Sequence, residues 1–212
     1  MRKRLCILLS LLAFTATGCA SQTSLSYLDP TPQEAANTQI FGADINKVWD
    51  AAIKSIGEQF FVLDNIEKDS KIITLSFSVD NPEEYIDCGL LTYDNSGGMS
   101  GNGQTSFAGA AKYATFLRSD GTPHPKLFER RTKLEGKVNI IFSTEGKNKT
   151  RAIINSHDIM SIAVSGHRFV PQGYSGFLLP VSDSATATFN TGQTGKTDKG
   201  VTSCVRAIRL KD

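Results

Sequence analysis

The stretch that decides the predicted fold is DINKVWDAAIKSIGEQFFVLDNIEKDSKIITLSFSV, from Asp44 to Val79. Its first part repeats apolar residues at helical spacing, and an aspartate at the start is a typical N-cap. We therefore expect a helix from Asp44 to about Gly57, a residue that suits a helix end. Trp49, the single tryptophan, lies in the middle of the apolar stripe. We interpret it as a core anchor of the helix.

Two strands are predicted after this helix, over residues 60–66 and 71–79. In the second strand, serine and threonine alternate with apolar residues, a pattern typical of a half-buried strand. A short strand over residues 38–43 precedes the helix. A helix with one apolar face needs a sheet to cover it. The order strand, helix, strand, strand therefore predicts an antiparallel sheet packed on one principal helix.

Two segments carry a resemblance to known proteins. Lys47–Ala52 together with Phe60–Phe77 resembles the helix-grip repeat of lipoprotein subunits in the outer-membrane β-barrel assembly machinery. Pro82–Gly89 resembles a segment of proteobacterial lipoproteins that have a second cysteine near the C-terminus, and Cys204 fits that pattern. The resemblance implies an envelope lipoprotein with a helix-grip-like fold, and it brings no catalytic residues with it.

The rest of the chain is predicted to add two hairpins. One pairs residues 132–142 with 150–157, and the other pairs 185–190 with 201–210. Two glycine- and proline-containing stretches, near 92–130 and over 166–182, are predicted to be irregular loops. The expected fold class is α+β, in a single periplasmic domain over residues 38–212.

The N-terminus predicts where the protein is located. A basic start, an apolar run and then Ala16-Thr17-Gly18-Cys19 are typical of a secretory signal over residues 1–18. The last four residues resemble the lipobox of bacterial lipoproteins, which implies cleavage between Gly18 and Cys19 and acylation of Cys19 with fatty acids such as palmitate. Because Ala20 follows the cysteine, the resemblance implies anchoring in the outer membrane, facing the periplasm, with exposure on the cell surface as the alternative. Residues 19–37 are polar and contain two prolines, so we expect a flexible tether after the lipid.

Cys88 and Cys204 remain once Cys6 is removed with the signal and Cys19 is acylated. An even pair in an oxidising compartment favours a disulfide bond between them. Two free buried thiols or a metal pair are the alternatives. No histidine lies at a short spacing from either cysteine, so we expect no metal site and no cofactor.

Charge argues against one class of partner. Three of the 23 basic residues and none of the 21 acidic residues lie in the signal, so the mature chain has a net charge of about −1. Nucleic-acid binding requires concentrated positive charge, and we therefore expect no nucleic-acid partner. A basic cluster interrupted by Glu129 and Glu135 is interpreted as a solvated face, with acidic lipid or lipopolysaccharide as the alternative partner. It consists of Lys126, Arg130, Arg131, Lys133 and Lys137.

A partner surface is predicted in the stretch interpreted as a long loop. Its apolar residues are Tyr93, Met99, Phe107, Tyr113 and Phe116. Loops presented by a rigid scaffold often carry binding residues, and plain disorder is the alternative.

The sequence offers no catalytic constellation. Ser156, His157 and Asp158 are adjacent, but consecutive residues of a strand point to opposite faces and cannot all converge. We expect no enzymatic activity. The leading hypothesis is a lipid-anchored envelope protein that binds other proteins or assists an assembly complex. The alternative is a periplasmic carrier that holds a lipid or another amphiphile between helix and sheet.

Overall fold

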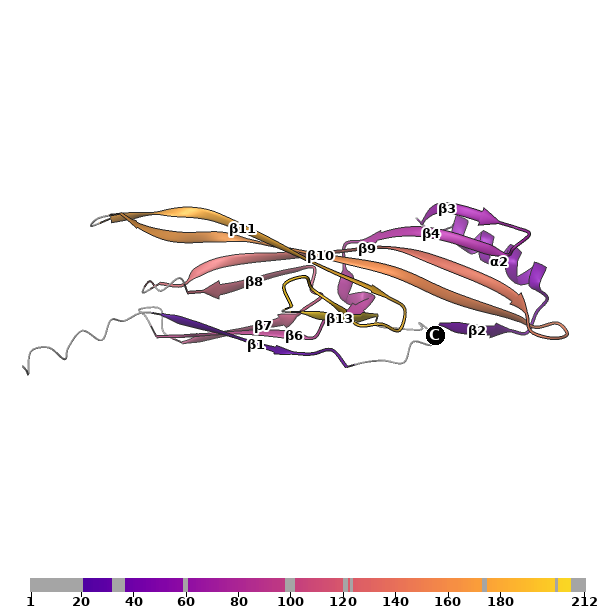
Figure 1. Cartoon of the computed structure of the whole chain (residues 1–212), viewed down its shortest axis with the longest axis horizontal. Coiled ribbons are helices and arrows are strands. Elements are labelled where there is room, and N and C mark those ends of the chain that lie inside the picture. Colours follow the sequence, from indigo (N-terminus) through magenta and orange to yellow (C-terminus); the bar gives the residue numbers. More distant parts are fainter. Residues whose placement is uncertain are drawn as a thin grey trace, which may run out of the picture.

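The computed structural model describes residues 21–31, 37–58, 61–97, 102–119, 122, 124–172, 175–200 and 202–206. The lipidation and cleavage predictions at Gly18 and Cys19 lie outside these residues, as does Met99. The molecule is elongated, with long paired strands that run along its main axis (Figure 1). Its strands are β1 (Gln22–Leu28), β2 (Thr38–Phe41), β3 (Val62–Glu67), β4 (Ile72–Val79), β5 (Ile86–Asp87), β6 (Leu90–Ser96), β7 (Gly103–Ala108), β8 (Tyr113–Arg118), β9 (Lys126–Thr144), β10 (Thr150–Gln172), β11 (Ser175–Asn190), β12 (Gly195–Lys196) and β13 (Ser203–Arg206). The helices are α2 (Ile45–Gly57) and the short 3₁₀ helix η1 (Pro82–Glu84).

The expected α+β class is wrong, because the structure is mostly β, with 66% in strands and 9% in helices. The main sheet has the order β11-β10-β9-β4-β3, with β2 also paired to β10 and β8 also paired to β9. Two smaller sheets have the orders β1-β6-β7 and β12-β13-β5. The helix-grip-like arrangement fails because α2 covers only one end of the main sheet, while strands cover the rest (Figure 1).

One face of the main sheet holds both hydrophobic clusters. Along β9, Leu134 belongs to one cluster, and Phe142 to the other. Both numbers are even and the β9–β10 register is continuous, so both side chains point to the same face. α2 covers the end of this face that contains Phe142, which we call the far end. The two small sheets cover the end that contains Leu134, which we call the near end.

The helix and the three strands predicted within residues 38–79 are all present, with bounds close to those predicted. Asp44 is the N-cap of α2, and its side chain accepts a hydrogen bond from the Asn46 backbone N–H at 2.9 Å. Trp49 is 4% exposed and meets Phe142 of β9 edge to face, with 5.8 Å between the ring centroids. β3 and β4 form the expected antiparallel pair.

The two predicted irregular loops are strands. The stretch near 92–130 forms most of β6, all of β7 and β8, and the start of β9, and the stretch 166–182 forms the ends of β10 and β11. The glycines in these stretches made the strand pattern hard to recognise. Gly166 is needed within its strand, because a Cβ at this position would lie 2.4 Å from the Phe128 ring. The Phe128 ring of β9 lies across β10 at Gly166, where any larger residue would collide with it.

The predicted last hairpin also has different partners. β11 pairs with β10 along its whole length, and β13 pairs with β12 and β5. A sequence pattern identifies a strand but not its neighbour, since pairing depends on contacts between distant segments.

The expected tether is replaced by a strand in its described part. β1 pairs with β6 from Gln22↔Ser96 to Leu28↔Leu90. The Tyr27 hydroxyl accepts a hydrogen bond from the Ser203 backbone N–H at 2.8 Å and lies 2.9 Å from the Ser203 carbonyl. Burial raises the pKa of Tyr27, and the hydrogen bond to the Ser203 backbone opposes this shift. Residues that follow Cys19 closely in the sequence are therefore part of the folded domain.

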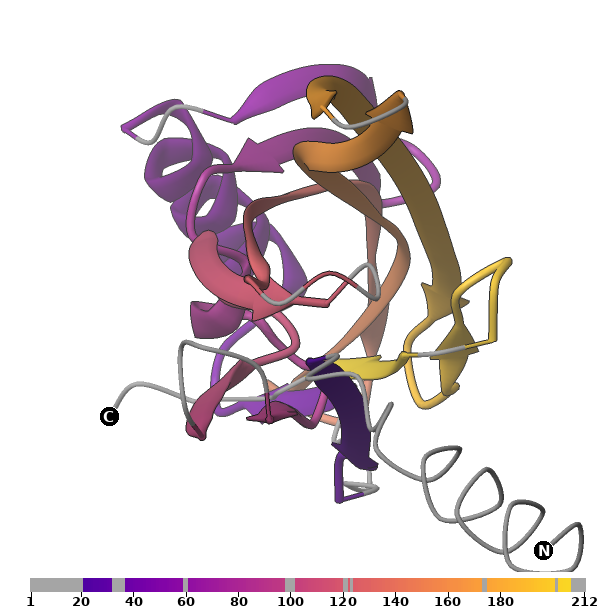
Figure 2. The ribbon, with the colours of Figure 1, turned by 90° about the vertical axis from the view of Figure 1, so that its left-hand side faces the viewer.

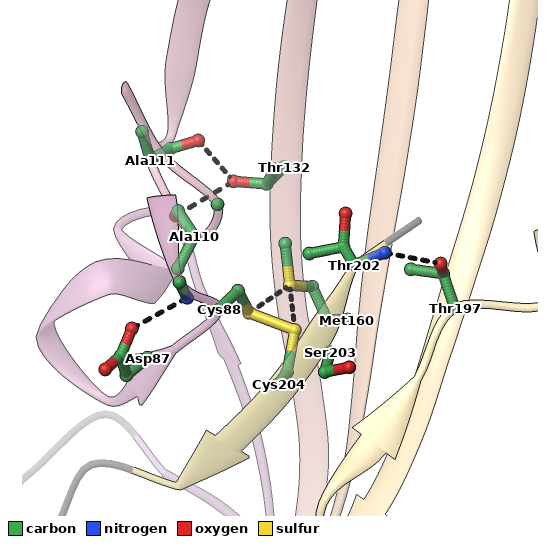
Figure 3. The surroundings of a disulfide bond; sticks show 12 residues. Asp87, Cys88, Ala110, Ala111, Thr132, Met160, Thr197, Thr202, Ser203 and Cys204 are labelled. Carbon is green, nitrogen blue, oxygen red and sulfur yellow. Dashed lines mark hydrogen bonds between the residues drawn. A yellow bond between two sulfur atoms is a disulfide. The ribbon is translucent and has the colours of Figure 1, made fainter. Parts of the chain in front are cut away.

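A disulfide bond joins Cys88 and Cys204, with an S–S distance of 2.09 Å (Figure 3). Both cysteines are buried in the cluster that contains Met160. The Met160 sulfur lies 3.1 Å from the Cys88 sulfur and 3.4 Å from the Cys204 sulfur. Because disulfide sulfurs carry no hydrogen, these are packing contacts. The bond fixes β13 beside the strands that cover the near end of the main sheet.

Candidate functional site

A cavity of about 530 Å³ lies between the near end of the main sheet and the small sheet that contains β1 and β6. Seen from that end, the strands enclose the region in a ring (Figure 2). The volume falls in the range of small-molecule binding sites. The space between α2 and the sheet, where the carrier hypothesis put a ligand, is instead filled by Trp49 and its neighbours.

Most of the cavity wall is apolar. Aliphatic side chains come from four strands: Leu25, Leu91, Ile162, Val164, Val181 and Ala185. The aromatic part is a stack in which Tyr93 lies 4.1 Å from Phe116 and Phe116 lies 5.8 Å from Phe128, between ring centroids. Such a wall favours a ligand with a substantial apolar part, because burial removes that part from water.

Among the described residues of the wall, Arg130 is the only charged side chain that is buried, being 3% exposed. Its Nη2 donates a hydrogen bond to the Gly109 carbonyl oxygen at 2.5 Å, and its guanidinium lies 5.7 Å from the centroid of the Phe107 ring. Its Nη1 is buried and has no hydrogen-bond partner among the described residues. No described carboxylate forms an ion pair with Arg130. This cation therefore keeps an unused donor inside the protein.

Burial lowers the pKa of Arg130 from its ordinary value to about 10, and nearby Tyr93 opposes the shift. The side chain remains protonated at neutral pH, since the pKa is still well above 7. Burial also raises the pKa of Tyr93, while Arg118 and Arg130 oppose that shift. The cavity thus holds a positive charge beside a neutral phenol.

Exposed charges surround the cavity at Arg118, Asp183 and Lys199. Lys199 forms an ion pair with Asp183. The pKa of Asp183 is lowered by the hydrogen bond from Lys199, then by the Ser184 backbone N–H, with a smaller effect from Arg118. These exposed charges partly neutralise one another, whereas the buried charge of Arg130 has no counterpart.

Arg206 provides a direct comparison. Its Nη1 donates to the two carboxylate oxygens of Asp158 at 2.7 and 2.8 Å, and Asp158 is 0% exposed. The Ser156 hydroxyl donates to the same carboxylate at 2.7 Å. The neighbouring His157 is exposed, so the three adjacent residues do not converge. This buried charge pair is satisfied within the protein, and Arg130 is not.

The predicted partner residues do not form one exposed surface. Phe116 is 3% exposed, Tyr93 and Phe107 are half-buried in the same aromatic stack, and Tyr113 is 50% exposed on β8. Tyr93 and Phe116 line the cavity. Because this stretch is strand, Tyr93, Phe107 and Phe116 pack together, whereas Tyr113 is exposed, and a partner surface in this stretch stays a prediction.

Arg130 was missed because it was counted with the basic cluster as a solvated residue. Its neighbours in that cluster, Arg131 and Lys133, are exposed. The alternation of side chains along a strand could have identified it. Phe128, Arg130, Thr132 and Leu134 have even numbers and so share one face of the strand, and the three neighbours of Arg130 on that face are buried. A charged residue in phase with apolar residues is a candidate for a buried site.

Among the described residues, no group of histidine, cysteine, aspartate or glutamate side chains is suited to hold a metal ion. In the same part of the chain, no helix has the length and apolar character needed to cross a membrane. No protein-family model matches this chain, and neither a curated protein nor a solved structure was found to be similar to it.

Proposed function

We propose that this chain is a bacterial envelope lipoprotein that binds an anionic amphiphile in the cavity beside Arg130. The observation that carries the proposal is the buried guanidinium, whose Nη1 has no partner among the described residues, beside the aromatic and aliphatic part of the cavity wall. Acylation of Cys19, outer-membrane location and the absence of catalysis belong to the same proposal. Acylation and location are supported by the signal sequence and the lipobox-like Ala16–Cys19, and the absence of catalysis by the lack of a catalytic constellation in the sequence.

An isolated buried charge costs free energy that a ligand can recover. A guanidinium has five N–H donors in a planar fork that matches a carboxylate or a phosphate. In Arg130 the Gly109 carbonyl occupies one part of this fork, and Nη1 remains for a ligand oxygen. A headgroup oxygen at Nη1 would complete the hydrogen bonding and neutralise the charge.

The aromatic and aliphatic wall supports a ligand whose apolar part is large. A small inorganic anion would satisfy Nη1 but would leave this wall in contact with water. A fatty acid or another acyl compound with an anionic headgroup meets both requirements. The outer face of the main sheet has a second hollow of about 660 Å³, lined by Leu127, His167 and Pro180 among others. No buried charge lines it, so it is a weaker candidate.

A dansyl-labelled fatty acid tests the proposal. Added to the purified Cys19→Ser protein, which cannot be acylated, it should gain fluorescence in a saturable manner. Its methyl ester should bind at least about tenfold more weakly, because it lacks the charge that pairs with Arg130. Equal binding of acid and ester, or no saturable binding of either, would contradict the proposal. Mass spectrometry of a solvent extract of the protein would identify a natural ligand that copurifies.

A second candidate function, binding of an envelope protein, is favoured by β3. This strand is an edge of the main sheet, and all six of its residues are exposed, with Val62 at 63% and Leu63 at 46%. Exposed edge strands present unpaired backbone groups and accept strands from other chains.

Photocrosslinking in cells tests this second function. A photoreactive amino acid at Val62 should give a discrete crosslinked species, because a strand added to β3 would lie beside it. The matched control is Ile159, which is 37% exposed but lies within β10, paired on both sides. Identical crosslinking patterns from the two positions, or none from Val62, would argue against a partner at this edge.

A further inference from the structure

The end of the β10–β11 hairpin extends beyond the rest of the main sheet. The β9–β10 pairing stops at Gly166↔Phe128, whereas β10 and β11 remain paired from His167↔Pro180 to Gln172↔Ser175. We call these paired residues, 167–172 and 175–180, the tip ribbon; it projects at one end of the molecule (Figure 1). A two-stranded ribbon is marginally stable alone in water. A surface that covers such a ribbon would therefore stabilise it.

Both faces of the tip ribbon carry exposed apolar side chains. Phe177 is 49% exposed, Leu178 55% and Leu179 38%. Because neighbouring residues of a strand point to opposite faces, Leu178 lies on one face and the other two lie on the opposite face. The segment from His167 to Pro180 contains no aspartate or glutamate. Both faces therefore favour an apolar environment, and neither carries negative charge.

Cations lie at the base of the tip ribbon. Lys126 Nζ lies 5.7 Å from the centroid of the Phe169 ring, and Arg168 is exposed on the ribbon itself. Apolar and aromatic residues with adjacent lysine and arginine are typical of segments that enter the membrane–water interface of bilayers with anionic lipids.

Ser21, the first residue that the structure describes, lies at the same end of the molecule. The Ser21 backbone N–H donates to the Thr122 carbonyl at 3.3 Å, and the Ser21 hydroxyl donates to the same oxygen at 2.6 Å. Lys126 Nζ in turn donates to the Thr122 hydroxyl at 3.4 Å. Ser21 is thus connected through one residue to the lysine that contacts Phe169. Ser21 follows Cys19 by two residues, a length of chain that spans at most about 7 Å.

We propose that the tip ribbon inserts into the surface of the bilayer that holds the acyl chains of Cys19. The inference rests on the acylation of Cys19 that the proposed function includes. With anchor and ribbon at one end, the long axis of the domain points away from the membrane, and α2 lies at the far end (Figure 1). Val181 and Ser182, which directly follow the ribbon, line the cavity beside Arg130. The cavity then lies close to the bilayer from which an amphiphile would come.

Vesicle binding by the non-acylated Cys19→Ser protein tests the insertion separately from the anchor. The protein should cosediment with vesicles of phosphatidylethanolamine and phosphatidylglycerol. Adding Leu178→Asp should weaken this binding at least about tenfold, because a charge replaces an apolar side chain in the interface. The matched control is Ile40→Asp on β2, a residue that is 49% exposed at the other end of the molecule, and it should bind as the parent does.

Fluorescence gives a second, less disruptive readout. Phe177→Trp places a tryptophan in the ribbon, whereas the native Trp49 is a residue of α2 that is buried against the main sheet. Vesicles of brominated lipid should quench the Phe177→Trp protein and leave the parent unquenched. Equal quenching of both proteins, no cosedimentation of the parent, or undiminished cosedimentation with Leu178→Asp would overturn the inference. So would a tip-dependent crosslink to another protein without vesicle binding.

These outcomes are distinct from those of ligand binding. Leu178→Asp should retain saturable binding of the dansyl-labelled fatty acid in solution, since Leu178 does not line the cavity. Loss of vesicle binding with retained fatty-acid binding would support both proposals. Vesicle binding without fatty-acid binding would leave the insertion standing and remove the proposed ligand.

Discussion

Replacing Arg130 by methionine should weaken binding of the dansyl-labelled fatty acid by about 30-fold or more, without destabilising the protein. The affinity falls because the ligand headgroup loses the only buried cation in the cavity wall. A similar loss is expected for any ligand that pairs with the guanidinium. The fluorescence titration that measures the parent also measures the variant.

The effect on stability has the opposite sign from that expected for a structural arginine. A basic group whose pKa is lower in the folded state costs stability at every pH below that pKa, and the cost is relieved as pH rises through it. With a pKa of about 10 for Arg130, the full cost is present at neutral pH, where it amounts to about 3 kcal/mol. Loss of the hydrogen bond to the Gly109 carbonyl destabilises the variant by about 1–3 kcal/mol and so offsets part of this relief. The free energy of unfolding should therefore be unchanged or higher by up to about 2 kcal/mol.

Urea unfolding of the ligand-free parent and variant measures this change. Arg118→Met is the matched control, since it removes an exposed cation next to the same cavity. It should change fatty-acid affinity by no more than about threefold, because exposed charges contribute little. If Arg130→Met instead unfolds at a clearly lower urea concentration and binds the fatty acid normally, Arg130 holds the fold together and has no role in ligand binding.

The parts that the sequence predicted correctly are those with local causes. Asp44 and the apolar stripe through Trp49 lie within one helix, and each strand of the β3–β4 hairpin has its partner next along the chain. β1 could not be recognised in the same way. Its partner β6 begins about sixty residues later, and its own apolar alternation is limited to Leu25 and Tyr27, which lie among polar residues and close to Pro30.

The site was hidden for a different reason. Its residues come from β1, β6, β8, β9, β10 and β11, so the cavity exists only after distant strands have paired. Tyr93 and Phe116 were noticed as apolar, but their burial depends on that pairing. For Arg130, residue type suggested the surface and strand parity suggested the interior. Parity was the better guide, and the unpaired Nη1 became visible only in three dimensions.

The satisfied charge pair of the core should behave in the opposite way from Arg130. Asp158→Asn should lower the free energy of unfolding by about 3–5 kcal/mol, because it leaves Arg206 without its counter-charge. The Asp158 carboxylate is 0% exposed and receives hydrogen bonds from both Arg206 and Ser156. Arg206 lies on β13, two residues after the disulfide cysteine Cys204, so the pair also attaches this strand to β10.

Urea unfolding of Asp158→Asn, with Asp183→Asn as the matched control, measures this contribution. Asp183 pairs with Lys199 on the surface, and its replacement should leave the free energy of unfolding nearly unchanged. The double variant Asp158→Leu with Arg206→Met should recover much of the lost stability, since it removes both charges together and leaves neither unpaired. A loss of under 1 kcal/mol for Asp158→Asn, comparable with that of the exposed pair, would mean that water reaches this carboxylate and that the disulfide and the pairing with β5 and β12 suffice to hold β13.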